Sequence, residues 1–308
     1  MSSLGLGTYL GQPDEATDRR YADAVTAAAR GGINCFDTAI NYRHQRSERS
    51  VGAALGPMFA SGELQRDEVV VATKAGFLTP GAVPDGLAPA DVVGKMHSMA
   101  PDFLTDQVNR SRANLGLDTL DIFYLHNPEA QLQFVDRDEF DERIRAAFRR
   151  LEELVKQGTI VYYGTATWDG YRVEGKLDLA RLAEIAGEEA GPGHHFRFIQ
   201  LPFNLGMVEA MNKKPESVLE IAGRLGITVV ASASLLQARL TRDLPEPIGE
   251  RLPGLETDAQ RAIQFTRSTP GIAVALAGMS DAAHVADNLG VGTIPPATPE
   301  QHRRLFEG

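Results

Sequence analysis

Four side chains that can bind or transfer a proton follow successive predicted strands. Asp37, Lys74 and His126 each come at the carboxyl end of such a strand, and Tyr42 follows Asp37 by five residues. In a barrel of parallel strands, neighbouring carboxyl ends open onto one mouth, so we expect these groups to gather around one point. Each alone has an ordinary structural explanation. A carboxylate, an ammonium and an imidazole at three strand ends in succession would be an improbable coincidence.

This combination suits the delivery of a proton to an oxygen atom. Free tyrosine has a pKa of about 10, too high for efficient proton donation near neutrality, and an adjacent ammonium group lowers it. Lys74 would act on Tyr42 in this way, and Asp37 would keep the lysine protonated and oriented. His126 would position a carbonyl oxygen or share in proton delivery. Such a site also requires hydride delivery to carbon, which a nicotinamide cofactor performs and no side chain can.

The strands that would carry these residues alternate with helices. They are near-continuous apolar runs, which is typical of parallel strands covered on both faces. The predicted strands are Leu4–Gly7, Ile33–Asp37, Val69–Thr73, Leu120–His126, Ile160–Gly164, Phe196–Leu201, Ile227–Ala231 and Ile272–Leu276. Terminal glycines and caps predict helices between them. These helices are Thr17–Arg30, Ser47–Leu55, Leu104–Leu115, Glu139–Gln157, Pro215–Leu225 and a last one from an N-cap at Ser280 to Leu289.

About eight strand-and-helix units, with no linker long enough to separate a pair of domains, predict an α/β fold of the (β/α)₈ TIM-barrel type. One such domain is expected over residues 1–308. A doubly wound open sheet is the competing α/β arrangement. Gly76–Asp102, Pro128–Asp138 and Leu240–Glu256 do not fit the repeat. They are expected to be long loops at the C-terminal face, where such barrels build their active sites.

Composition excludes several classes of function. Lys and Arg total 31 against 41 Asp and Glu, a formal net charge of −10 that argues against nucleic-acid binding. The single cysteine, Cys35, rules out an internal disulfide and a cysteine-based zinc site, and no metal site is predicted. No apolar run is long enough to cross a membrane, and the N-terminus lacks signal-peptide features. We therefore expect a cytoplasmic protein that binds neither nucleic acid nor a membrane.

Further motifs resemble the aldo-keto reductase superfamily, in order and over nearly the whole chain. They occupy residues 32–42 (GINCFDTAINY), 47–52 (SERSVG), 71–74 (VATK), 115–128 (LGLDTLDIFYLHNP), 154–160 (LVKQGTI), 200–204 (QLPFN) and 278–288. The resemblance implies a (β/α)₈ barrel that reduces carbonyl compounds with NADPH. It also implies that Asp37, Tyr42, Lys74 and His126 form its catalytic tetrad.

The resemblance also implies a cofactor site. This sequence departs from the family pattern at two places in that site. After the fifth strand Ala166 and Thr167 replace the usual Ser-Asn, and after the seventh Ser232 replaces a tyrosine that stacks on the nicotinamide. Residues 278–281 contain no Lys or Arg, so Arg239 or Arg242 is expected to supply charge for a 2′-phosphate. NADP is the expected cofactor and NAD the alternative. The candidate cofactor-binding residues are Thr167, Gln200, Ser232, Arg239, Gly278, Ser280, His284 and Asn288.

Four aromatic residues after strand ends are expected to wall the substrate pocket, with packing under the loops as the alternative. They are Tyr9, Phe77, Trp168 and Phe203. The expected function is NAD(P)H-dependent reduction of a small aldehyde or ketone, such as a sugar, to an alcohol. The two departures keep open a cofactor-binding regulatory or scaffold barrel with vestigial catalysis. A Schiff-base aldolase using Lys74 leaves Tyr42 and His126 without a role. The substrate and the oligomeric state cannot be predicted.

Overall fold

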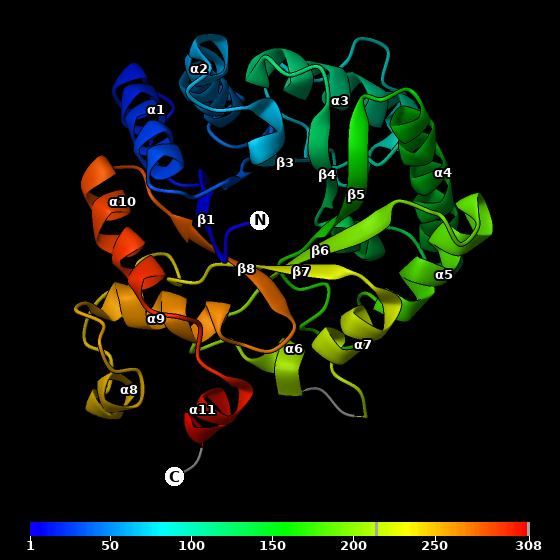
Figure 1. Cartoon of the computed structure of the whole chain (residues 1–308). Coiled ribbons are helices and arrows are strands. Elements are labelled where there is room, and N and C mark those ends of the chain that lie inside the picture. The colour runs from blue at the N-terminus through cyan, green and yellow to red at the C-terminus, as the bar shows by residue number, and fades with distance from the viewer. Residues whose placement is uncertain (213–214, 307–308) are drawn as a thin grey trace.

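The computed structural model describes residues 1–212 and 215–306. Eight strands, all parallel to their neighbours, pair in sequence order, and the last pairs with the first. The sheet therefore closes into a barrel, with helices arranged around its outside (Figure 1). This confirms the predicted (β/α)₈ TIM barrel and excludes the open, doubly wound sheet.

Every predicted strand is present, with shifts of a few residues at some ends. The strands are β1 (Leu4–Gly7), β2 (Cys35–Asp37), β3 (Val70–Ala75), β4 (Leu120–His126), β5 (Ile160–Ala166), β6 (Phe196–Pro202), β7 (Thr228–Ser232) and β8 (Ile272–Gly278). Strand β5 runs beyond its predicted end because its ladder with β6 continues to the pair Ala166 and Gln200. The pairing register brings the ends of β2 to β6 to one mouth.

The barrel is enclosed by helices, of which six were predicted. The α-helices are α1 (Glu15–Arg30), α2 (Arg46–Ser61), α3 (Pro101–Leu115), α4 (Arg137–Lys156), α5 (Leu179–Ala190), α6 (Glu209–Asn212), α7 (Val218–Leu225), α8 (Glu246–Arg251), α9 (Asp258–Arg267), α10 (Ala282–Leu289) and α11 (Pro299–Arg304). The 3₁₀ segments are η1 (Arg66–Glu68), η2 (Pro89–Asp91), η3 (Pro128–Gln133) and η4 (Gly290–Thr293). The three predicted long loops therefore contain η2, η3 and α8.

Several predicted helix boundaries were wrong: α1, α3 and α4 begin two or three residues before their predicted starts, and three other boundaries have a specific physical reason. Helix α2 passes through Gly56 and ends at Gly62, because its buried face continues to Met58 and packing outweighs the local stop signal. Helix α7 begins after Ser217, which forms a capping box with Glu220, rather than at Pro215. Helix α10 is capped by Asp281, not Ser280, since the Asp281 carboxylate accepts the Ala283 N–H at 2.8 Å.

Strand alternation decides which residues enter the barrel. On β4, Ile122 and Tyr124 face the barrel interior, whereas Phe123 and Leu125 pack against the surrounding helices. The interior is filled by Cys35, Ala72, Ile122, Tyr124, Ala166, Phe198, Val230, Val274 and Leu276. Because side chains alternate with a period of two, the next inward position on β4 is His126. The same count points Asp37 inward after Cys35 on β2 and Lys74 inward after Ala72 on β3.

Candidate active site

The structure brings the four predicted proton-handling residues together at the mouth of the barrel. Lys74 Nζ lies 2.6 Å from Asp37 Oδ2, donates to the Thr38 carbonyl oxygen at 2.7 Å, and lies 4.8 Å from the centre of the Tyr42 ring. The Tyr42 ring meets the His126 ring edge to face, with 5.8 Å between their centres. This clustering was predicted from the strand ends alone.

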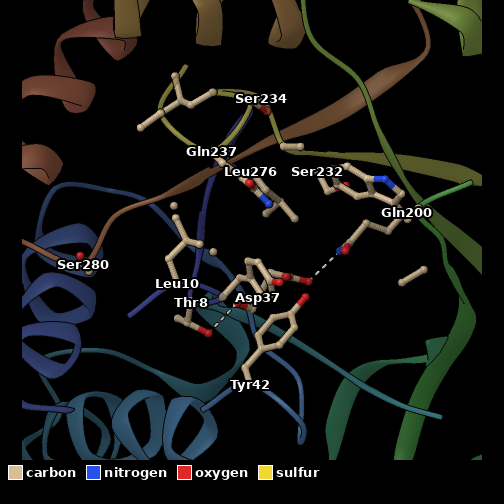
Figure 2. Close-up of a pocket in the computed structure, with 18 of the residues that line it drawn as sticks. Thr8, Leu10, Asp37, Tyr42, Gln200, Ser232, Ser234, Gln237, Leu276 and Ser280 are labelled. Atoms are coloured by element: carbon tan, nitrogen blue, oxygen red, sulfur yellow. Dashed lines mark hydrogen bonds between the residues drawn. The ribbon is translucent and has the colours of Figure 1, made fainter. Parts of the chain in front are cut away.

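The ion pair between Lys74 and Asp37 lies behind the phenol, away from solvent. Both side chains are buried, and the second oxygen of Asp37 accepts a hydrogen bond from Gln200 Nε2 at 2.7 Å (Figure 2). Burial lowers the pKa of Lys74, and the adjacent Asp37 carboxylate opposes that shift. The Asp37 carboxylate therefore has partners on both oxygens, which offsets the cost of burying it.

The expected net lowering of the Tyr42 pKa beside Lys74 is not found in this structure. Burial of the phenol and the negative charge of Asp37 raise the pKa of Tyr42 well above its ordinary value. Lys74 directs its described hydrogen bonds to Asp37 and Thr38, and its Nζ lies 4.8 Å from the centre of the Tyr42 ring. Tyr42 therefore remains a protonated phenol across the neutral pH range.

His126 is a neutral imidazole. Burial, with the positive charge of Lys74, holds its pKa well below the ordinary value. Its Nδ1 is buried without a hydrogen-bond partner among the described residues, and the side chain lines the cavity at the barrel mouth. A buried N–H without an acceptor is rarer in proteins than a buried acceptor without a donor, so the proton belongs on Nε2. His126 can thus donate a hydrogen bond into the cavity.

A cavity of about 910 Å³ extends from these residues toward α10. Figure 2 shows Tyr42, Asp37 and Gln200 around one region of it and Ser280 on the opposite side. The cavity is lined by most of the predicted cofactor residues, namely Thr167, Gln200, Ser232, Gly278, Ser280, His284 and Asn288. No Lys or Arg of the described chain is among its lining residues.

The structure does not bring Arg239 to the cavity. Arg239 is exposed, and Gln237 and Ala238 line the cavity from the same loop after β7. Leu236, Gln237 and Ala238 have left-handed backbone angles, with φ of 45°, 52° and 67°, and this turn leaves Arg239 outside. Arg242 is also exposed and does not line the cavity.

Several polar atoms of the cavity wall fit a nucleotide cofactor. Thr167 Oγ1, Ser234 Oγ and Asn288 Oδ1 are buried and lack partners among the described residues, and all three residues line the cavity. Buried polar atoms are normally hydrogen-bonded, so these atoms call for a polar ligand. The amides and hydroxyls of a nicotinamide dinucleotide supply suitable donors and acceptors.

Three of the four predicted aromatic walls line the cavity. The Tyr9 ring lies 5.0 Å from Tyr42 and the Phe77 ring 5.2 Å from His126, and Trp168 also belongs to the lining. Phe203 was wrongly placed: it is buried outside the barrel, stacked on Phe265 at 5.9 Å. Because Gln200 points into the barrel, the residue three positions later points outward to α9.

Two buried residues behind His126 carried no sequence signal and were missed. His97 Nε2 donates to the backbone oxygen of His126 at 2.8 Å, and Gln131 donates to His97 Nδ1 at 3.2 Å. Arg143 of α4 in turn donates to Gln131 Oε1 at 2.9 Å. Gly76 allows this approach, since a Cβ there would lie 2.5 Å from His97 Nε2. His97 therefore supports the backbone of His126.

Replacing His97 by Gln is expected to reduce the pH dependence of folding stability. Burial lowers the pKa of His97 to about 4, so below the ordinary value of 6.5 the unfolded chain binds a proton that the folded one does not. Stability from the neutral ring is therefore complete above about pH 6.5 and is lost as pH falls toward 4. Urea unfolding of the wild type at pH 7 and pH 5 should show a loss of about 2 kcal/mol from this group.

The matched control for this prediction is His44→Gln, because His44 is exposed. That substitution should leave the difference between the two pH values unchanged. An equal pH dependence in wild type and His97→Gln would contradict the assignment.

The sequence and the fold are both similar to those of known proteins. The sequence profile of the aldo/keto reductase family matches residues 3–251. An aldo/keto reductase from Klebsiella pneumoniae, solved with NADP and acetate, is 22% identical, with a TM-score of 0.70, over 99% of this chain and 92% of that one. The holo form of an aldo-keto reductase from Bacillus halodurans is 24% identical, with a TM-score of 0.69, over 99% and 91%.

One relative is described as a channel subunit and not as a reductase. A Schizosaccharomyces pombe protein, described as a candidate beta subunit of a voltage-gated potassium channel, is 23% identical over 341 residues, which span 100% of this chain and 89% of the relative. In the described residues of this chain, no helix combines the length and apolarity that crossing a bilayer requires.

Proposed function

Because the chain belongs to the aldo/keto reductase family, we propose that it catalyses the NADP(H)-dependent reduction of a small aldehyde or ketone to an alcohol. The observation that carries the proposal is the pairing of a protonated Tyr42 with a neutral His126 at one end of a cavity whose buried polar atoms lack partners. A protonated phenol and an imidazole N–H together can receive a carbonyl oxygen that becomes a hydroxyl.

Each of the four residues has a distinct role in the proposed reaction. A bound nicotinamide supplies hydride to the carbonyl carbon. His126 donates its Nε2–H to the carbonyl oxygen and orients it, and Tyr42 gives its phenolic proton to that oxygen as the new C–H bond forms. Lys74, 4.8 Å from the centre of the phenol ring, stabilises the negative charge that the phenol acquires, and Asp37 keeps the ammonium in place.

NADP(H) is the proposed cofactor, with NADH accepted as well. Support for NADP(H) comes from the related solved structures that contain NADP or NADPH. At the α10 end of the cavity, Ser280, His284 and Asn288 offer polar contacts. The start of α10 is already capped by the carboxylate of Asp281, which disfavours a second anion there.

The dissociation constants for NADPH and NADH are expected to differ by less than about tenfold, in favour of NADPH. A tenfold difference corresponds to about 1.4 kcal/mol, less than a charge-assisted contact to a 2′-phosphate would supply. The described cavity lining offers no Lys or Arg for such a contact. Calorimetric titration of both cofactors measures the ratio. A preference of more than about a hundredfold would mean that a basic side chain reaches the phosphate.

Steady-state assays test the proposed reaction directly. The purified protein is incubated with NADPH or NADH and a panel of aldehydes, ketones and sugars, while nicotinamide absorbance is followed. Turnover of a carbonyl substrate with matching alcohol formation supports the proposal. Tight cofactor binding without turnover on any of them would instead favour a cofactor-binding regulatory or scaffold barrel, an alternative in keeping with the channel-subunit description of the Schizosaccharomyces pombe relative.

A further inference from the structure

A buried carboxylate outside the proposed reaction centre connects two of the loops at the barrel mouth. Glu129 lies in η3, three residues after His126, and is 5% exposed. Its Oε1 accepts three backbone N–H groups from the loop after β5, those of Trp168 at 3.2 Å, Asp169 at 3.2 Å and Gly170 at 3.1 Å. Successive backbone N–H groups directed at one oxygen form an anion-binding nest, here occupied by the protein's own carboxylate.

These three bonds hold the end of the loop that carries Trp168. The other end of the loop has its own supports: the Leu177 N–H donates to the Gly170 oxygen at 2.9 Å, and the Tyr171 hydroxyl lies 2.6 Å from Thr165 Oγ1. Gly170 allows the loop to fold back, since a Cβ there would lie 2.6 Å from Leu177 Cδ1. Thr167 and Asp169, on either side of Trp168, also keep contacts of their own, to the Gln200 backbone oxygen and to Arg172. Loss of the Glu129 contacts would therefore leave the Trp168 N–H without its described partner and loosen this residue, while the rest of the loop stays attached.

Glu129 takes no role in the proton transfer and does not line the cavity. Its other oxygen, Oε2, is buried and has no partner among the described residues. Burying a carboxylate is costly, and here the compensation comes from the three N–H groups of the Trp168 loop. The buried carboxylate and the Trp168 loop therefore stabilise each other.

We propose that Glu129 is a positioning residue that sets the substrate range: it fixes the backbone of the Trp168 loop, and the indole of Trp168 then decides how bulky a carbonyl substrate the cavity accepts. Trp168 is 40% exposed and belongs to the cavity lining, so the place of its indole depends on its backbone more than on surrounding packing. The statement on substrates rests on the proposed function, whereas the statement on the position of Trp168 does not.

The experiment uses Trp168 as its own reporter, because it is the only tryptophan in the chain. Emission wavelength and acrylamide quenching are measured for wild type, Glu129→Ala, Glu129→Asp and Glu129→Gln. Glu129→Ala and Glu129→Asp should red-shift the emission and increase quenching, because the indole becomes more exposed. Glu129→Gln keeps an oxygen at the Oε1 position as a neutral acceptor and should fall between wild type and Glu129→Ala.

The kinetic arm compares a bulky and a small substrate. In Glu129→Ala, KM for naphthaldehyde should change by about tenfold, within the range expected when one wall of an apolar pocket is altered. The kcat for propanal should stay within about twofold of wild type, because the proton donor and its supports are untouched. A parallel fall of kcat for both aldehydes would overturn the proposal in favour of a general structural role.

The matched control is Glu152→Ala. Glu152 is also buried and accepts a backbone N–H, that of His195 at 2.6 Å, but at the amino-terminal end of β6, opposite the cavity. It should alter stability without changing Trp168 emission or the KM for either aldehyde. Wild-type emission and quenching in Glu129→Ala, or equal changes in both variants, would overturn the proposal.

Two further outcomes remain informative. If Glu129→Ala does not fold, Glu129→Asp and Glu129→Gln decide the question by the same emission and quenching measurements. If no carbonyl substrate is turned over, the proposed function fails. The fluorescence arm still decides whether Glu129 holds Trp168.

Discussion

Replacing Tyr42 by Phe is expected to lower kcat for any good carbonyl substrate by a factor of about 10²–10⁴, the usual contribution of a positioned general acid. The substitution keeps the ring over Lys74 and beside His126 but removes the hydroxyl that would give a proton to the substrate oxygen. Cofactor affinity should barely change, because the polar residues at the α10 end of the cavity, Ser280, His284 and Asn288, are untouched by the substitution. Steady-state kinetics and calorimetric cofactor titration measure the two effects separately.

The matched control is Tyr9→Phe. The Tyr9 ring lies 5.0 Å from that of Tyr42 and also lines the cavity, but Tyr9 is 57% exposed. Removal of its hydroxyl should leave kcat within a few-fold of wild type. Near wild-type turnover in Tyr42→Phe would defeat the assignment of the proton donor, whatever the substrate.

The wild-type kcat should also vary little with pH around neutrality. The pKa of Tyr42 is raised by burial and that of His126 is lowered by it, so neither group changes its protonation state in this range. A kcat profile with a step near pH 6.5 that disappears on substitution of His126 would contradict the assignment of a neutral imidazole.

The fold and the central cluster were predictable because both depend on local repetition. Apolar runs mark parallel strands, and the alternation of side chains along β2, β3 and β4 determines that Asp37, Lys74 and His126 face inward. The same rule, applied to β6, would have corrected Phe203, since Gln200 faces inward and Phe203 follows it by three positions, an odd offset. The error arose because Phe203 was placed by its position after the strand end, without asking which face of the strand its side chain would occupy.

Other features of the site depend on contacts that no local pattern encodes. Glu129 reaches Trp168 across 39 residues, and His97 reaches the His126 backbone across 29, each through loops without hydrophobic periodicity. Arg239 could not be excluded from the sequence, because the left-handed turn that directs it outward is formed by Leu236, Gln237 and Ala238, none of them glycine. This segment therefore contains no glycine that would have predicted a left-handed turn.

Replacing Lys74 by Met is expected to reduce both stability and turnover. Lys74 and Asp37 form a buried ion pair at 2.6 Å, and removal of the ammonium leaves the Asp37 carboxylate with only Gln200 as its side-chain partner. Breaking such a pair from one side typically costs about 3–5 kcal/mol. Turnover should also fall, since the charge that developing phenolate character at Tyr42 requires is gone. Urea unfolding and kcat measured on the same preparations give the two losses.

The double variant Lys74→Met with Asp37→Asn separates these two effects. Removing the uncompensated carboxylate should restore most of the lost free energy of unfolding, because an amide is far less costly to bury than a charge. Turnover should stay low, because neither substitution returns a cation to the Tyr42 ring. If the double variant regained wild-type turnover together with its stability, the ammonium of Lys74 would serve only to hold the fold, and the phenol would transfer its proton without help from a neighbouring charge.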